Sequence, residues 1–160
     1  MIYFVMCIYY RPLKNGNIQE FVFELDRNKF ELISPIDVNF RFTVYEKFIV
    51  FDINTLNKSN QGYGTALISI VLEYAKENKF DFVAGHLARA DFENGNWKKS
   101  IDFYLHRLST AFLIKSDLFM RDLYPQYENT QDFFDSQTHY YSYDNFIKEF
   151  SEGYIIYPMA

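Results

Sequence analysis

The chain has 160 residues, 49% of them hydrophobic and 23% charged. This composition predicts one domain over residues 1–160 with a full hydrophobic core, and it excludes a disordered or low-complexity chain. Aromatic residues make up 21% and could stack nucleobases, but that mode needs a basic groove, whereas the net charge here is −5. Nucleic acid is therefore not the expected partner.

The single cysteine, Cys7, cannot form an internal disulfide, so the chain does not depend on an oxidising compartment. Its apolar neighbours favour a buried structural thiol over a reactive one. Residues 1–10 lack the basic start and cleavage site of a secretion signal, and no segment approaches the roughly 18 apolar residues that span a bilayer. These features predict a soluble, cytoplasmic protein with no membrane partner. The many aromatic residues leave a homodimer open.

The N-terminal third has the pattern of an antiparallel meander. Strands are predicted over 2–10, 18–25, 29–33 and 36–45. Asn15-Gly16 is a strong hairpin-turn signal between the first two. In the fourth, alternate residues are expected on one buried face: Ile36, Val38, Phe40, Phe42 and Val44.

The next stretch predicts a strand, a glycine-containing turn, a helix and another strand. The strands cover 48–53 and 80–87, and the helix begins near Thr65. Its apolar stripe is Leu67, Ile68, Val71, Leu72 and Ala75. Such a βαβ unit requires a parallel strand pair with a right-handed crossover.

The rest of the chain alternates between helix and strand patterns. A second helix is predicted over 97–108, a strand over 111–114, helices over 117–124 and 143–150, and a last strand over 154–157. The fold class is therefore α/β (α+β): a mixed, mostly antiparallel sheet with one parallel βαβ unit and flanking helices.

The turn before the first helix predicts an anion site. Glycines let the main chain approach a ligand closely, and the first N–H groups of a helix lie unpaired at the positive end of its dipole. Phosphate is the usual anion in such a site. A tight turn with no ligand explains a short Gly-x-Gly as well.

The run from Gln61 to Leu67, the helix and strand after it, and the second helix with Tyr104 together resemble the GNAT superfamily of acyl-CoA-dependent N-acyltransferases. The likeness covers roughly residues 48–108. It implies that acetyl-CoA is the acyl donor and that backbone amides of the loop hold its pyrophosphate. The implied cofactor-binding residues are Gln61, Gly62, Tyr63, Gly64 and Thr65, with Ser59 at the family's Arg or Gln position.

The same resemblance implies that Tyr104 is the general acid that protonates the leaving thiolate. A core tyrosine explains its position on an apolar helical stripe equally well. The chain also departs from the family pattern. Only the Asn15-Gly16 turn joins the first two strands, where the family has two helices that shape the acceptor site.

The transfer needs a group that removes a proton from the acceptor amine. Asp52 has apolar neighbours whose burial would raise its pKa, although a solvated carboxylate at a strand edge is the simpler interpretation. His86 is a second candidate base, with a structural histidine as the alternative. His106 and His139 have no partners at metal-ligand spacing, so no metal site is predicted.

The resemblance implies an N-acetyltransferase acting on an amine-bearing substrate, either a small molecule or a protein. The acidic, aromatic segments 132–135 and 139–144 could face such a cationic acceptor, or could simply cover the sheet. The alternative function is a catalytically degenerate GNAT-like module that binds a protein partner, with or without coenzyme A. A nucleotide-binding domain ranks third, because the chain lacks the lysine of a P-loop and the spacing of a dinucleotide-binding motif.

Overall fold

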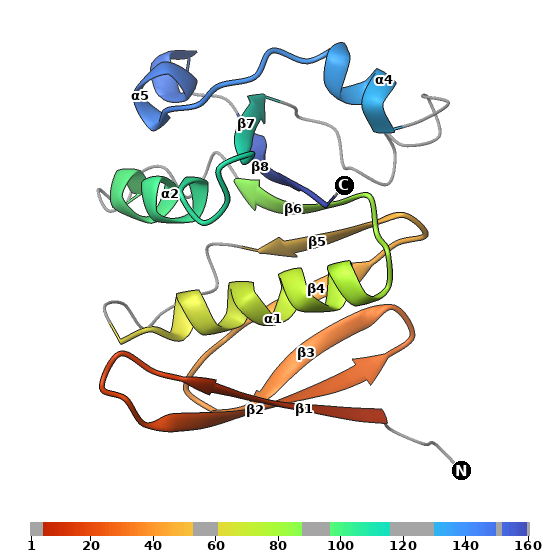
Figure 1. Cartoon of the computed structure of the whole chain (residues 1–160), viewed down its shortest axis with the longest axis vertical. Helices are drawn as coiled ribbons and strands as arrows, with labels where there is room; N and C mark the ends of the chain where they lie inside the picture. The colour runs from red at the N-terminus through yellow and green to blue at the C-terminus, as the bar shows by residue number, and fades with distance from the viewer. Residues whose placement is uncertain (1–4, 53–60, 88–96, 116–129, 150–151, 160) are drawn as a thin grey trace. The chain divides into compact units, whose positions relative to one another are not determined.

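A computed structural model describes residues 5–52, 61–87, 97–115, 130–149 and 152–159. Within it the chain divides into two compact units, Met1–Phe80 and Asp81–Ala160. The strands within each unit pair with one another in antiparallel fashion (Figure 1). The prediction of a single domain stays a prediction.

The N-terminal unit is built on an antiparallel meander in which each strand pairs with the next along the chain. Its strands are β1 (Val5–Pro12), β2 (Ile18–Asp26), β3 (Lys29–Ser34), β4 (Arg41–Val44) and β5 (Phe48–Asp52). The predicted Asn15-Gly16 hairpin is confirmed, with Gly16 at φ +88° and the Asn17 N–H donating to Asn15 Oδ1 at 2.9 Å. The short connections explain why the predicted strand order holds.

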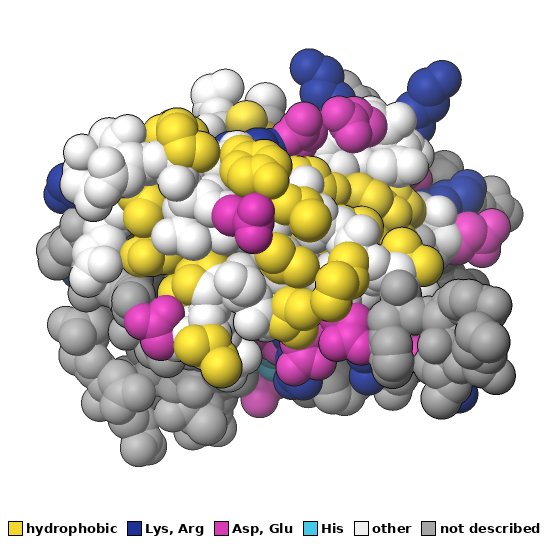
Figure 2. All heavy atoms as spheres, turned by 90° about the horizontal axis from the view of Figure 1, so that it is seen from below, with side chains coloured by type: hydrophobic (Ala, Val, Ile, Leu, Met, Phe, Trp, Pro, Cys, Tyr) yellow, Lys and Arg dark blue, Asp and Glu magenta, His cyan; other side chains and the backbone are white. Residues whose placement is uncertain are grey.

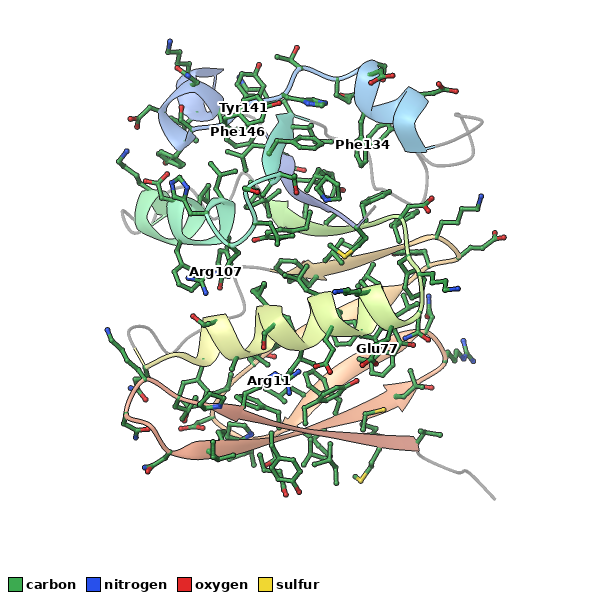
Figure 3. All side chains as sticks on the ribbon, in the orientation of Figure 1. Arg11, Glu77, Arg107, Phe134, Tyr141 and Phe146 are labelled. Carbon is green, nitrogen blue, oxygen red and sulfur yellow. The ribbon has the colours of Figure 1, made fainter. Side chains whose placement is uncertain are left out.

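Helix α1 (Tyr63–Glu77) covers one face of this sheet (Figure 1). Its Tyr74 ring packs on Phe30 and Phe42, at centroid distances of 5.1 and 6.1 Å. Arg11 reaches from β1 to the helix, where it donates to Ser69 Oγ at 3.0 Å and pairs with Glu73 (Figure 3). The predicted apolar stripe is buried, except that Leu72 is only half-buried.

The predicted strand over 36–45 is wrong in its first half, since only Arg41–Val44 is a strand. The Val38 N–H donates to Pro35 O, so the chain turns there instead of extending. Ile36 is 95% exposed rather than inward. Val38, Phe40 and Phe42 are buried as expected, because the apolar alternation survives in an irregular backbone.

In the C-terminal unit, β8 (Gly153–Pro158) lies between β6 (Phe82–Leu87) and β7 (Phe112–Lys115) and pairs antiparallel with both. Its helices are α2 (Trp97–Leu105), α4 (Thr130–Asp135) and α5 (Tyr143–Phe146), with a 3-10 turn η4 (Ile147–Glu149). Phe82 and Phe112 pack on Phe134 of α4, at centroid distances of 4.9 and 5.5 Å. The sequence pattern did not predict α4, and the predicted helix over 117–124 lies outside the described residues.

The chain is therefore an α+β protein with mostly antiparallel strands, as predicted. The strand, helix and strand of the expected βαβ unit are β5, α1 and β6. Their parallel pairing, which is what makes the arrangement GNAT-like, stays a prediction. Among the described helices, none has the length and apolar character needed to cross a membrane.

Candidate phosphate-binding site at the start of helix α1

Helix α1 begins earlier than the sequence predicted, at Tyr63 rather than near Thr65. Gly62 is its N-cap residue in a left-handed conformation, at φ +92°. Among the described residues, no side chain caps the helix, and its first turn holds no acidic residue. The N–H groups of Gly64 and Thr65 fall in this first turn, where an α-helix provides no internal acceptor, so they lie at the positive end of the helix dipole.

The β1–β2 hairpin turn lies directly against this glycine turn. The Lys14 N–H donates to the Gln61 carbonyl at 3.1 Å. A Cβ atom on Gly62 would come within 2.8 Å of the Lys14 backbone nitrogen, and its positive φ already disfavours any other residue. Gly62 is therefore required for the approach of the two turns, whether or not a ligand binds.

An open pocket of about 400 Å³ lies between the two turns. Its lining residues are Leu13, Lys14, Asn15, Gln61 and Tyr63. None of these residues is acidic. Lys14 is exposed and provides a cation, and Asn15 and Gln61 provide side-chain amides beside the N-terminus of α1. A phosphate group is the ligand that these donors suit.

The predicted loop residues play different parts. Tyr63 is buried, and its ring packs edge-on against Phe21 at 6.2 Å, so this side chain belongs to the core. Gln61 and Thr65 are exposed. Ser59 lies outside the described residues. The loop therefore contributes backbone donors, while Tyr63 anchors the start of the helix.

Lys14 is the residue that the sequence analysis missed. The Asn15-Gly16 signal places Lys14 in a hairpin turn, but nothing local places that turn beside Gln61, 47 positions further along the chain. The contact depends on how α1 crosses the sheet. A basic residue in a hairpin turn is too common to indicate a ligand by itself.

Asp52 ends β5 as an ion-paired carboxylate. The Arg41 Nε atom lies 3.2 Å from Asp52 Oδ2, and the Asp52 side chain is 29% exposed. Its neighbour Phe51 is buried and pairs with Phe42 on the sheet face that α1 covers. Because strand side chains alternate, Asp52 points to the opposite face. The simpler of its two predicted roles, a carboxylate at a strand edge, fits this position better.

Tyr104 belongs to α2 in the C-terminal unit and is 4% exposed. Its backbone carbonyl accepts a 2.5 Å hydrogen bond from the Tyr157 hydroxyl. Burial raises the pKa of the Tyr104 phenol, so this group holds its proton at neutral pH, as a general acid must. The same burial makes release of that proton more costly. Both predicted roles for Tyr104, catalytic acid and core residue, stay open.

His86 lies on β6 with its Nε2 atom 3.8 Å from Glu152 Oε2 and its ring against Tyr154. Its side chain is only partly exposed. A carboxylate beside an imidazole can support proton transfer, but it also holds a structural histidine in place. Among the described residues, no group of three or more His, Cys, Asp or Glu side chains could hold a metal ion.

The acidic, aromatic C-terminal segments pack mainly on their own unit. Phe133 and Phe134 are buried in the core. The His139 ring stacks on Phe112 at 4.0 Å, and Asp144 pairs with Lys98 at 3.0 Å. The structural alternative for these segments therefore accounts for most of their described side chains.

Comparisons with protein-family models, curated proteins and solved structures found no match to this chain. The GNAT relationship and the acetyltransferase activity are therefore proposals.

Proposed function

We propose that the chain is an acyl-CoA-dependent N-acetyltransferase whose coenzyme A pyrophosphate binds at the start of α1. The observation that carries this proposal is the uncapped helix N-terminus at Gly62, placed against Lys14 of the hairpin turn. The main-chain donors and the lysine ammonium together complement a diphosphate. The resemblance of residues 48–108 supports coenzyme A over other phosphate-bearing ligands.

In the proposed reaction the acceptor amine attacks the thioester carbonyl of acetyl-CoA, which forms an amide bond and breaks the carbon–sulfur bond. The amine loses a proton, and the thiolate of coenzyme A gains one. Tyr104 is the proposed donor of that second proton. Asp52 or His86 is the proposed acceptor of the proton that the amine loses, either directly or through a water molecule.

Acetyl-CoA is expected to raise the thermal unfolding midpoint, because a ligand that binds only the folded state stabilises it by mass action. At a hundredfold excess over its Kd the gain is about 2.7 kcal/mol, or roughly 5 to 10 °C for a chain of this size. Lys14→Glu is expected to weaken binding about tenfold and so to remove about half of that gain. Differential scanning fluorimetry over an acetyl-CoA titration measures both.

Lys29→Glu is the matched control, since it makes the same charge change on another exposed residue of the same sheet. Lys29 follows the β2–β3 turn, at the far end of β2 from Lys14, roughly 27 Å away along the strand. Acetyl-CoA should raise the thermal unfolding midpoint of this variant as much as that of the unmodified chain. No shift at millimolar acetyl-CoA would contradict the proposal, and equal losses in both variants would contradict the placement of the site.

Tyr104→Phe is expected to lower the kcat of acetyl transfer about a hundredfold if its hydroxyl is the general acid. The assay is release of free coenzyme A thiol in the presence of a panel of amines. The acetyl-CoA shift should persist in this variant, because Tyr104 is not assigned to pyrophosphate binding. Unchanged turnover would show that the acid role is wrong.

The second candidate function is a degenerate GNAT-like module that binds a partner. The observation in its favour is the tight 13–17 turn between β1 and β2, at the place where the family inserts two helices that shape the acceptor site. A thermal shift with acetyl-CoA but no turnover on any amine would favour this function over catalysis.

A further inference from the structure

The face of the N-terminal sheet that lies opposite α1 is apolar and exposed at β1 and β2. Met6, Ile8, Tyr10 and Ile18 are each between 52% and 65% exposed. The strand register places them on one face, since Tyr10 pairs with Glu20 and Pro12 with Ile18. Figure 2 looks onto this side of the molecule and shows apolar side chains running together with carboxylates among them. An exposed patch of this kind marks an interaction surface.

Two carboxylates on this face lie opposite each other on neighbouring strands, and their repulsion opposes the pairing of those strands. Glu24 pairs directly across the strands with Glu31, and like charges in that position repel. Within the described part of the chain, neither glutamate forms an ion pair. Arg41 lies opposite Glu31 on the next strand, but its guanidinium pairs with Asp52. Glu20 lies on the same face and accepts a 3.0 Å hydrogen bond from the Tyr10 hydroxyl. A cationic partner would relieve the repulsion.

A second copy of the chain fits this face poorly. Face-to-face packing of two copies would put Glu20, Glu24 and Glu31 of each chain into one interface, where they outnumber Lys29 and Arg41, the basic residues that the register places on the same face. Edge-to-edge pairing through β1 would extend the sheet, but it would leave Met6, Ile8 and Tyr10 uncovered. Charge complementarity therefore selects a basic partner.

We propose that this surface, the acidic sheet face, docks an amphipathic basic segment of another protein. The acidic sheet face comprises Met6, Ile8, Tyr10, Ile18, Glu24 and Glu31. The apolar side of the segment covers the β1–β2 residues, and its Lys or Arg side chains lie over Glu24 and Glu31. This docking needs no coenzyme A and is independent of the proposed acetyltransferase activity.

The test uses a fluorescein-labelled helical peptide of about 18 residues, with leucines at i, i+3, i+4 and i+7 and lysines elsewhere. Its binding to the full chain is followed by fluorescence anisotropy without acetyl-CoA. The double variant Glu24→Lys/Glu31→Lys is expected to weaken binding at least about tenfold. It keeps a like-charge pair between positions 24 and 31, and it adds one between position 31 and Arg41, so thermal unfolding of the variant checks that it is folded.

Glu46→Lys/Glu77→Lys is the matched control, because it makes the same net charge change at two exposed positions off this face. It should bind the peptide within about twofold of the unmodified chain. Ile8→Ser should weaken binding as the glutamate reversals do, because it removes a central apolar contact. A peptide with serines in place of its leucines should bind at least about tenfold more weakly.

Equal affinities for the two double variants would overturn the proposal, since attraction would then come from net charge alone. Sedimentation equilibrium of the chain without peptide tests whether a second copy of the chain occupies this face. A dimer that Ile8→Ser converts to a monomer would assign the face to a second copy and would also overturn the proposal. A monomer that binds the lysine peptide only through the intact acidic sheet face is the expected result.

Discussion

Phe42→Ala is expected to lower the free energy of unfolding by about 3 to 5 kcal/mol, through the lost transfer energy of the ring and the cavity it leaves. Phe42 is 1% exposed and sits at the centre of the aromatic cluster in the N-terminal unit. Its ring stacks on Phe30 at 4.6 Å and meets Phe23 at 5.6 Å and Tyr74 of α1 at 6.1 Å. Removing it breaks contacts on three elements at once.

Urea denaturation followed by far-UV circular dichroism measures this effect. Ile36→Ala is the control, because it removes an apolar side chain of similar class that is fully in solvent, and it should change stability by less than about 0.5 kcal/mol. A Phe42→Ala midpoint as high as that of Ile36→Ala would contradict the assigned core.

Gly153→Ala is expected to destabilise the chain by about 3 kcal/mol or more. A Cβ atom at Gly153 would lie 2.1 Å from the Ile114 carbonyl oxygen and 2.8 Å from the Phe146 ring. The first neighbour is main chain in the paired strand β7, so it cannot move without breaking the β7–β8 ladder. Glycine is required at position 153 because the β7 main chain and the Phe146 ring leave no room for a side chain.

Gly16→Ala separates this effect from a general cost of replacing glycine. Gly16 has φ +88° but no atom within 4 Å of an added Cβ, so only backbone strain opposes the change, at about 1 to 2 kcal/mol. Both variants are compared by the midpoint of thermal unfolding. If Gly153→Ala proved no more damaging than Gly16→Ala, the tight packing of β8 against β7 would be wrong.

Local signals in the sequence predicted much of the fold. The β1–β2 hairpin follows from Asn15-Gly16, because Gly16 readily adopts the positive φ that the 13–17 turn requires. Helix α1 follows from apolar spacing, since the stripe that a helix buries is set by its period. The glycine turn before it follows from the glycines between a strand pattern and a helix pattern, and its role as an anion site stays a prediction.

Other features could not be predicted because they depend on distant neighbours. The irregular segment before β4 has a clean strand alternation, yet Val38 turns back to Pro35 while the apolar side chains stay buried. The two predicted roles of Asp52, a desolvated base and a solvated carboxylate at a strand edge, could not be separated in the sequence, because its ion pair with Arg41 forms between adjacent strands of the folded sheet. Both features depend on contacts that are made only in the folded sheet.

The sequence by itself determined the strands of the N-terminal meander, the amphipathic helix and the glycine turn, because each depends on residues close together in the chain. Only the tertiary structure decided that Lys14 lies beside Gln61. That contact arises from the packing of α1 on the sheet. It is set by the sum of many weak contacts across the N-terminal unit, which no short segment encodes.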